Sequence, residues 1–123
     1  MALDVLIADS SAAIRQILHR VLRQADARIG QVHEAAGGLE ALEKLRTEKI
    51  SLVLAGINLP DMDGLELLTQ IKANPEWRHL PVIMVAGAGS ESKVLSAAQL
   101  GAVGYVCKPF TAAQIQRALS SLG

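Results

Sequence analysis

Short apolar runs alternate with segments of helical hydrophobic spacing along the whole chain. The runs are rich in Val, Ile and Leu, which is typical of parallel strands buried on both faces. Only the second run, residues 31–35, is markedly less apolar. The pattern predicts strands at residues 3–8, 31–35, 50–55, 81–86 and 104–107.

The segment after each predicted strand repeats its apolar residues at helical spacing. Ser10 or Ser11 can cap the first of these helices, which should run to about Gln24. The third helix cannot continue through Asn74, because a residue that precedes proline, here Pro75, disfavours α geometry.

The last two helices carry their own boundary signals. Ser90 is expected to cap the fourth helix, and Gly101 is expected to end it. Thr111 and Gln114 have the spacing of a capping box at the start of the fifth helix.

Five strand–helix pairs in succession indicate an α/β domain. Parallel strands need right-handed helical crossovers, so the helices should cover both faces of one sheet. We predict a single domain over residues 1–123, a doubly wound five-stranded parallel sheet of the flavodoxin-like (βα)5 type with strand order 2-1-3-4-5. The first and third strands flank the point at which such sheets bind ligands, so Asp9 and Gly56 should be neighbours.

Composition narrows the function classes. The 123 residues have a formal net charge of zero and no basic block, which argues against nucleic acid or a charged membrane surface as partner. The single cysteine, Cys107, excludes an intrachain disulfide. Asp4 and Asp9 interrupt the first apolar run, so it is neither a signal sequence nor a membrane span. We expect a soluble, cytoplasmic protein.

Four segments carry a family resemblance in the order in which they occur. They are VLIADSSAAIR, LVLAGINLPDMDGLELL, LPVIMVAGAG and GAVGYVCKPFT. With them the chain resembles, over its whole length, the receiver domain of bacterial response regulators, above all the small single-domain chemotaxis type.

The resemblance implies a phosphorylation site. In such receivers a carboxylate at the end of the third strand accepts a phosphoryl group from a histidine kinase, and two acids after the first strand help to hold Mg²⁺. A hydroxyl ending the fourth strand and a lysine ending the fifth contact the phosphoryl oxygens. A carboxylate nucleophile gives a labile acyl phosphate, and a hard dication with oxygen ligands offsets its charge.

This sequence departs from that pattern at three of the five positions. Asp9 matches the first acid and Lys108 matches the lysine, but Ser10, Gly56 and Ala86 stand where the second acid, the phospho-acceptor and the switch hydroxyl belong. We therefore expect a degenerate receiver that takes no phosphate by the usual route.

The remaining site residues lead to three further expectations. Mg²⁺ would have Asp9, the carbonyl of Asn58 and water, so we expect no cofactor and weak magnesium binding at most. Without competing carboxylates, Asp9 could form a direct ion pair with Lys108. The resemblance also implies a cis peptide bond between Lys108 and Pro109.

Two functions follow as hypotheses. The first is a non-enzymatic signalling module, monomeric or weakly dimeric, that binds a histidine kinase or another signalling protein. The resemblance places its partner surface on the fourth helix, fifth strand and fifth helix, with Leu95, Gln99, Tyr105 and Gln114 as candidate contacts. The alternative is a pocket at Asp9 and Lys108 that senses an anion or small metabolite or keeps an enzymatic role.

Overall fold

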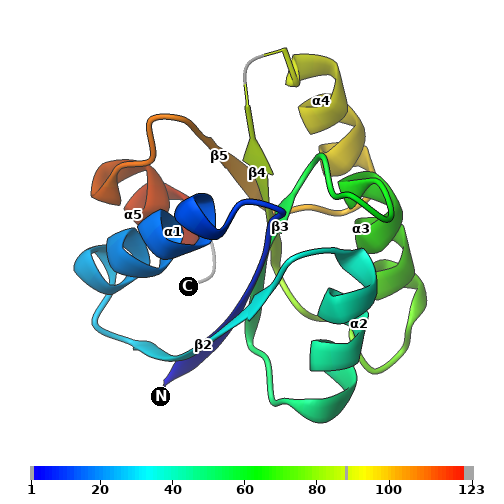
Figure 1. The fold of residues 1–123 in the computed structure, drawn as a ribbon, viewed down its shortest axis with the longest axis horizontal. Helices are drawn as coiled ribbons and strands as arrows, with labels where there is room; N and C mark the ends of the chain where they lie inside the picture. The colour runs from blue at the N-terminus through cyan, green and yellow to red at the C-terminus, as the bar shows by residue number, and fades with distance from the viewer. Residues whose placement is uncertain (1, 88, 121–123) are drawn as a thin grey trace.

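The computed structural model describes residues 2–87 and 89–120, which form five alternating strand–helix pairs (Figure 1). The strands are β1 (Leu3–Ala8), β2 (Ile29–Ala35), β3 (Leu52–Gly56), β4 (Val82–Ala86) and β5 (Gly104–Cys107). The helices are α1 (Ala12–Ala25), α2 (Gly38–Thr47), α3 (Gly64–Ala73), α4 (Glu91–Gln99) and α5 (Ala112–Ser120).

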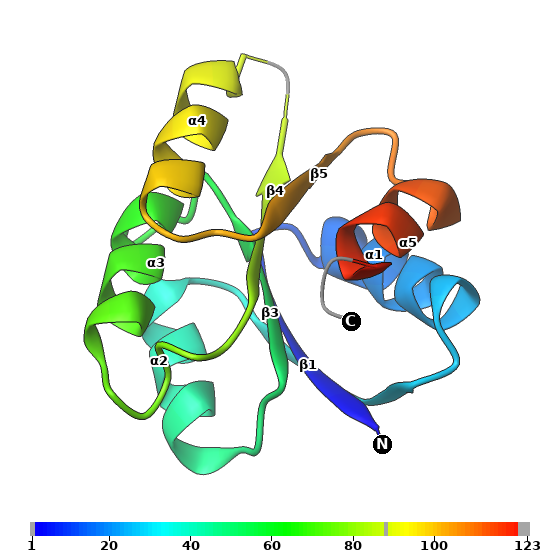
Figure 2. The same ribbon diagram turned by 180° about the vertical axis from the view of Figure 1, so that it is seen from behind.

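The sheet is parallel throughout and has the order β2-β1-β3-β4-β5. Helices α1 and α5 cover one face, and α2, α3 and α4 cover the other, as the two opposite views show (Figures 1 and 2). The doubly wound architecture predicted from the alternation is thus confirmed.

Each face of the sheet contributes to its own apolar core. Alternate residues of one strand enter different cores, because successive side chains point to opposite faces. In β1, Leu6 belongs to the core formed with α2, α3 and α4, whereas Val5 and Ile7 belong to the core formed with α1 and α5. The strands β3 and β4 are buried along their full length, which explains their continuous apolar runs.

Most predicted boundaries agree with the structure, and the differences are small. β1 and β5 have the predicted bounds, and α3 ends at Ala73 with Asn74 as its C-cap. β2 begins two residues early, at Ile29. β3 includes Gly56, because that residue pairs with Val85 of β4 and so extends the ladder by one position.

Two of the predicted caps differ from expectation. Of the two predicted candidates, Ser11 caps α1, since its Oγ accepts a hydrogen bond from Ile14 N at 3.2 Å. Ser90 precedes α4, but its side chain makes no capping hydrogen bond. At α5, Thr111 Oγ1 accepts from Gln114 N at 3.2 Å, whereas the Gln114 side chain does not close the capping box.

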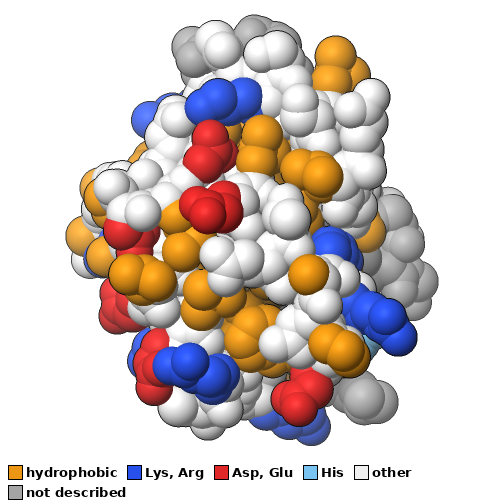
Figure 3. Space-filling view, turned by 90° about the vertical axis from the view of Figure 1, so that its right-hand side faces the viewer, with side chains coloured by type: hydrophobic (Ala, Val, Ile, Leu, Met, Phe, Trp, Pro, Cys, Tyr) orange, Lys and Arg blue, Asp and Glu red, His pale blue; other side chains and the backbone are white. Residues whose placement is uncertain are grey.

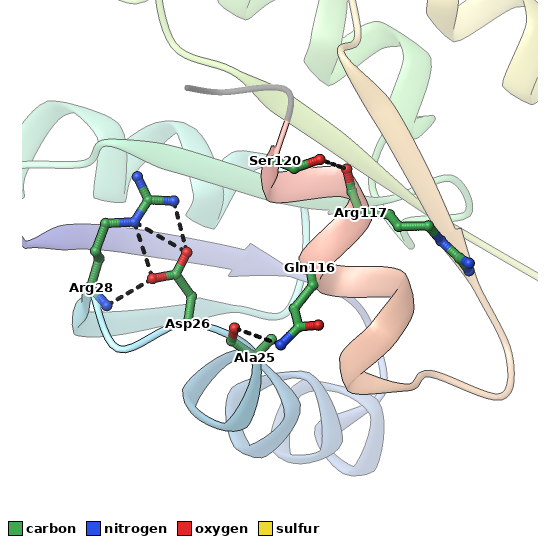
Figure 4. Close-up of polar contacts among 6 residues, drawn as sticks. All are labelled: Ala25, Asp26, Arg28, Gln116, Arg117 and Ser120. Carbon is green, nitrogen blue, oxygen red and sulfur yellow. Dashed lines mark hydrogen bonds and ion pairs between the residues drawn. The ribbon is translucent and has the colours of Figure 1, made fainter.

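Polar contacts fix the end of α1 against α5 and the following turn (Figure 4). Gln116 Nε2 donates to the carbonyl of Ala25 at 3.2 Å. Arg28 forms an ion pair with Asp26 at 2.7 Å, and hydrogen bonds from Arg28 hold the pKa of Asp26 below its ordinary value. The side chain of Arg117 points away from this cluster, toward β5 (Figure 4).

No helix of the described chain combines the length and the apolar character that crossing a membrane requires.

Candidate functional site

The candidate site residues gather where the strands end. Asp9 directly follows β1, Gly56 ends β3, Ala86 ends β4 and Lys108 follows β5. The register pairs Ala8 with Ala55, which confirms that Asp9 and Gly56 are neighbours. A pocket of about 200 Å³ lies between these strand ends, with Asp9, Ser10, Asn58, Ala86 and Lys108 among the residues of its wall.

Asp9 is held in place by the start of α1. Its Oδ1 accepts from Ser11 N at 2.9 Å, and its backbone carbonyl accepts from Arg15 Nη1 at 2.6 Å. The other oxygen, Oδ2, lies 2.8 Å from the point that a Cβ atom on Gly56 would occupy. The Asp9 carboxylate therefore leans into space that a side chain at position 56 would need.

The loop from β3 to α3 is tightly closed beside the pocket. Gly64 N donates to the carbonyl of Ile57 at 2.8 Å, and Asn58 forms an isolated bridge with Asp63. A Cβ atom on Gly64 would collide with the carbonyl oxygen of Gly56, so the close approach requires glycine. Asp63 Oδ1 caps α3 by accepting from Leu65 N at 2.8 Å.

Asp61 connects this loop to α2. Its carboxylate accepts from Gly38 N at 2.8 Å and from Leu39 N at 2.9 Å, at the amino end of that helix. These hydrogen bonds hold the pKa of Asp61 below its ordinary value, because they favour the charged form. Sequence reasoning missed this contact, since the partners are 22 and 23 residues apart and share no local motif.

Lys93 connects the same loop to α4. Its Nζ lies 3.6 Å from Asp63 Oδ2 and 3.4 Å from Asn58 Oδ1. All the acids of this loop, Asp61 and Asp63, are therefore engaged in contacts between elements. Lys93 was also missed, because one lysine in a helical segment carries no distinguishing pattern.

The segment around Lys108 is fixed by Gln114. The Lys108–Pro109 peptide bond is cis, which confirms the expectation. Gln114 Oε1 accepts from Cys107 N at 3.0 Å, while Nε2 donates to the carbonyls of Cys107 at 2.9 Å and Pro109 at 2.6 Å. This clasp grips the backbone on both sides of Lys108 and explains why the Gln114 side chain is not available for the capping box.

The predicted direct ion pair between Asp9 and Lys108 is wrong. Both residues line the pocket, but their charged groups are too far apart to pair. Asp9 is drawn toward Ser11 N, and Lys108 is an exposed side chain on a separately anchored segment. The Lys108 ammonium has no hydrogen-bond or ion-pair partner among the side chains that the structure describes.

A larger groove adjoins the pocket between α4 and β5. It has a volume of about 680 Å³ and is lined mainly by apolar side chains, including Val94, Leu95 and Tyr105. Ala86, Gly87 and Lys108 belong to the walls of both cavities. Leu95 and Tyr105 are 69% and 54% exposed, and Gln99 is exposed on the same helix as Leu95.

The donor set does not fit a magnesium site. Asp9 supplies the one carboxylate of the pocket wall, and Ser10 and Gly56 add none. Within residues 2–87 and 89–120 no three His, Cys, Asp or Glu side chains gather as a metal site would require. Magnesium prefers an octahedral shell of oxygen ligands with carboxylates among them, so this pocket offers little to hold it.

The sheet order and the pocket at its switch point define a flavodoxin-like α/β protein with a site at the carboxyl ends of β1 and β3. Residues 5–120 match the response regulator receiver domain family, and the chain belongs to it. This is a class of two-component signalling domain.

Curated relatives match nearly the whole chain. The chemotaxis protein CheY-3 of Vibrio cholerae is 36% identical over 120 residues, which are 98% of this chain and 91% of the relative. The chemotaxis protein CheY of Pseudomonas aeruginosa is 32% identical over 120 residues, 98% of this chain and 95% of the relative.

Solved structures agree with the fold. A response regulator from Chloroflexus aurantiacus superposes with a TM-score of 0.88 at 28% identity, covering 99% of this chain and 98% of that one. CheY4 of Vibrio cholerae superposes with a TM-score of 0.85 at 27% identity, covering all of both chains.

Proposed function

We propose that this receiver domain acts as a phosphorylation-independent binding module, in which Gly56 takes the position of the phospho-acceptor. The observation that carries the proposal is the combination of a β3 that ends without a carboxylate and an exposed apolar pair, Leu95 and Tyr105, beside the α4–β5 groove. The domain keeps a surface suited to a partner, whereas the described residues of the pocket include none suited to accept phosphate by the usual route.

No nearby side chain replaces the missing nucleophile. Asp61 binds the backbone of α2, and Asp63 caps α3 and pairs with Lys93. The Ser10 hydroxyl makes no hydrogen bond to any described residue that could act as its base. We infer that a small-molecule phosphodonor leaves the protein unlabelled and that Mg²⁺ binds weakly at most.

The partner surface comprises Leu95, Gln99 and Tyr105 together with the groove between β5 and α5. That second groove has a volume of about 730 Å³ and is bordered by Tyr105, Lys108 and Arg117. Neither Lys108 nor Arg117 pairs with an acid among the described residues. The matching ligand is a protein segment with an apolar anchor and acidic flanks, since complementary charge favours encounter and register.

The neighbouring face, which meets the partner surface along α4, gives less reason for such a choice. The face over α2, α3 and α4 shows hydrophobic side chains interspersed with both acidic and basic ones (Figure 3). The partner we propose is a histidine kinase or another protein of a two-component pathway. The domain itself would be non-enzymatic, cytoplasmic, and monomeric or weakly dimeric, with no nucleic-acid or membrane partner.

The test measures the affinity of this domain for purified histidine kinases and other two-component proteins from the same organism. Leu95→Ala and Tyr105→Ala should each weaken binding by about tenfold, as buried apolar anchors do. Leu39→Ala is the matched control, because Leu39 is 63% exposed on α2, outside the proposed surface.

Two results would contradict the proposal. Stoichiometric phosphate incorporated from acetyl phosphate, either as an acid-stable ester or as a hydroxylamine-sensitive acyl phosphate, would show that the site still reacts. Equal losses of affinity for Leu39→Ala and Leu95→Ala would place the partner elsewhere.

A further inference from the structure

Most charged groups at the carboxyl end of the sheet have partners. Arg15 Nε pairs with Glu34 at 2.8 Å, and Lys93 lies 3.6 Å from Asp63. The Asp61 carboxylate is engaged by the backbone of α2. Asp9 Oδ2 and the Lys108 ammonium are left without a charged partner among the described side chains.

Both residues line one small pocket, and their charged groups do not pair with each other. Asp9 is fixed through Ser11 N, and Lys108 is carried by the backbone that Gln114 clasps. The pocket measures about 200 Å³, below the roughly 300 Å³ at which pockets for drug-sized ligands begin. Its occupant would have only a few heavy atoms.

The sign of the two charges selects the ligand class. A simple anion is attracted by Lys108 and repelled by Asp9, and a simple cation experiences the reverse. A small molecule with an ammonium at one end and a carboxylate at the other gains at both ends. Ile14, Val85 and Phe110 supply an apolar wall for the short carbon chain between them.

From this arrangement we propose that the pocket binds a small zwitterion of the amino-acid class. The ligand carboxylate contacts Lys108 Nζ, and its ammonium contacts Asp9 Oδ2. The small pocket shares Lys108 with the proposed partner surface, but the inference is tested on the isolated chain, so its outcome does not depend on any protein partner.

The experiment records ¹H–¹⁵N spectra while glycine, β-alanine or 4-aminobutyrate is added. Two contacts worth about tenfold each correspond to a Kd of about 10 mM, so the titration extends to about 100 mM. We expect saturable shifts at Asp9, Gly56 and Lys108 for at least one zwitterion. Acetate and methylammonium carry one charge each and should bind at least about tenfold more weakly.

Variants assign the two contacts. Asp9→Asn keeps the oxygen that accepts from Ser11 N, and Lys108→Gln keeps most of the side-chain stem, so both should fold. Each should weaken zwitterion binding by about tenfold. Glu48→Gln and Lys49→Gln are the controls, since they remove the same charges from exposed residues at the other end of the sheet.

Three results would overturn the inference. If acetate binds as tightly as the zwitterions, only Lys108 contributes to binding. If methylammonium binds as tightly as the zwitterions, only Asp9 contributes. No saturable shift with any probe would show that the pocket is no zwitterion site.

Discussion

Asp9 Oδ2 lies 2.8 Å from the point at which a side chain on Gly56 would begin. That separation is shorter than ordinary contact, so any residue other than glycine at position 56 forces the Asp9 carboxylate to move. The missing acceptor and the position of Asp9 are therefore coupled. A substitution that restores a carboxylate at position 56 therefore also displaces the carboxylate of Asp9.

The Gly56→Asp variant tests this coupling. It would bring a second carboxylate against Asp9, and the two like charges would repel each other. With Ser10 and Ala86 unchanged, we expect little phosphate incorporation from acetyl phosphate in the presence of Mg²⁺, measured by intact-protein mass spectrometry.

The matched comparison restores all three positions in Ser10→Asp/Gly56→Asp/Ala86→Thr. This variant supplies the second metal-binding acid and the switch hydroxyl, so its labelling should clearly exceed that of the single variant. Robust magnesium-dependent labelling of Gly56→Asp alone would mean that Ser10 and Ala86 are less limiting than proposed.

Asp61 should make the protein sensitive to acid. Its folded-state pKa lies below its unfolded value because the carboxylate accepts hydrogen bonds from Leu39 N and Gly38 N. A depressed pKa contributes stability above the unfolded value, about pH 4, and this contribution is lost as pH falls through the folded value. Asp61→Ala should thus lower the urea midpoint at pH 7, and the difference from the wild type should shrink near pH 3.

Glu66→Ala is the control for this experiment, because it removes an exposed carboxylate from α3 that makes no hydrogen bond to a described residue, while the backbone hydrogen bond of Glu66 to Asp63 is kept. It should change the midpoint little at either pH. If the urea midpoint of Asp61→Ala differs from that of the wild type by the same amount at pH 7 and pH 3, the charge of the Asp61 carboxylate is not the cause of the destabilisation.

Gln114 and Gln116 lie on the same helix and offer a matched pair. The Gln114 side chain makes three hydrogen bonds to the β5–α5 connection. The Gln116 side chain makes a single one, to Ala25 (Figure 4). Gln114→Ala should cost roughly 1–2 kcal/mol of unfolding free energy, and Gln116→Ala at most about 0.5 kcal/mol. Equal losses of unfolding free energy, measured by urea denaturation, would show that the three hydrogen bonds of Gln114 stabilise the fold no more than the single one of Gln116.

Local sequence patterns were enough to predict the helices and strands and the location of the candidate site. The boundaries of β1 and β5, the Ser11 cap and the stop before Pro75 follow from burial periodicity, side-chain capping and proline sterics. The proximity of Asp9 and Gly56 follows from the strand order alone.

Side-chain pairing was not predictable in the same way. The Asp9–Lys108 pair was inferred from charge and proximity, yet Ser11 N and the Gln114 clasp hold the two groups apart. The contacts of Asp61 with α2 and of Lys93 with Asp63 join segments distant in sequence. Such contacts depend on loop geometry that apolar periodicity does not encode.

The exposed apolar pair on the proposed partner surface should be dispensable for stability. Leu95 and Tyr105 are 69% and 54% exposed, so truncating either removes little buried area. Leu95→Ala and Tyr105→Ala should change the unfolding free energy by no more than about 0.5 kcal/mol, whereas Leu67→Ala, at a fully buried site, should cost about 2–5 kcal/mol. Chemical denaturation of the three variants makes the comparison. A loss above about 1.5 kcal/mol for Leu95→Ala or Tyr105→Ala would assign that side chain to the core and remove the reason for considering it a partner contact.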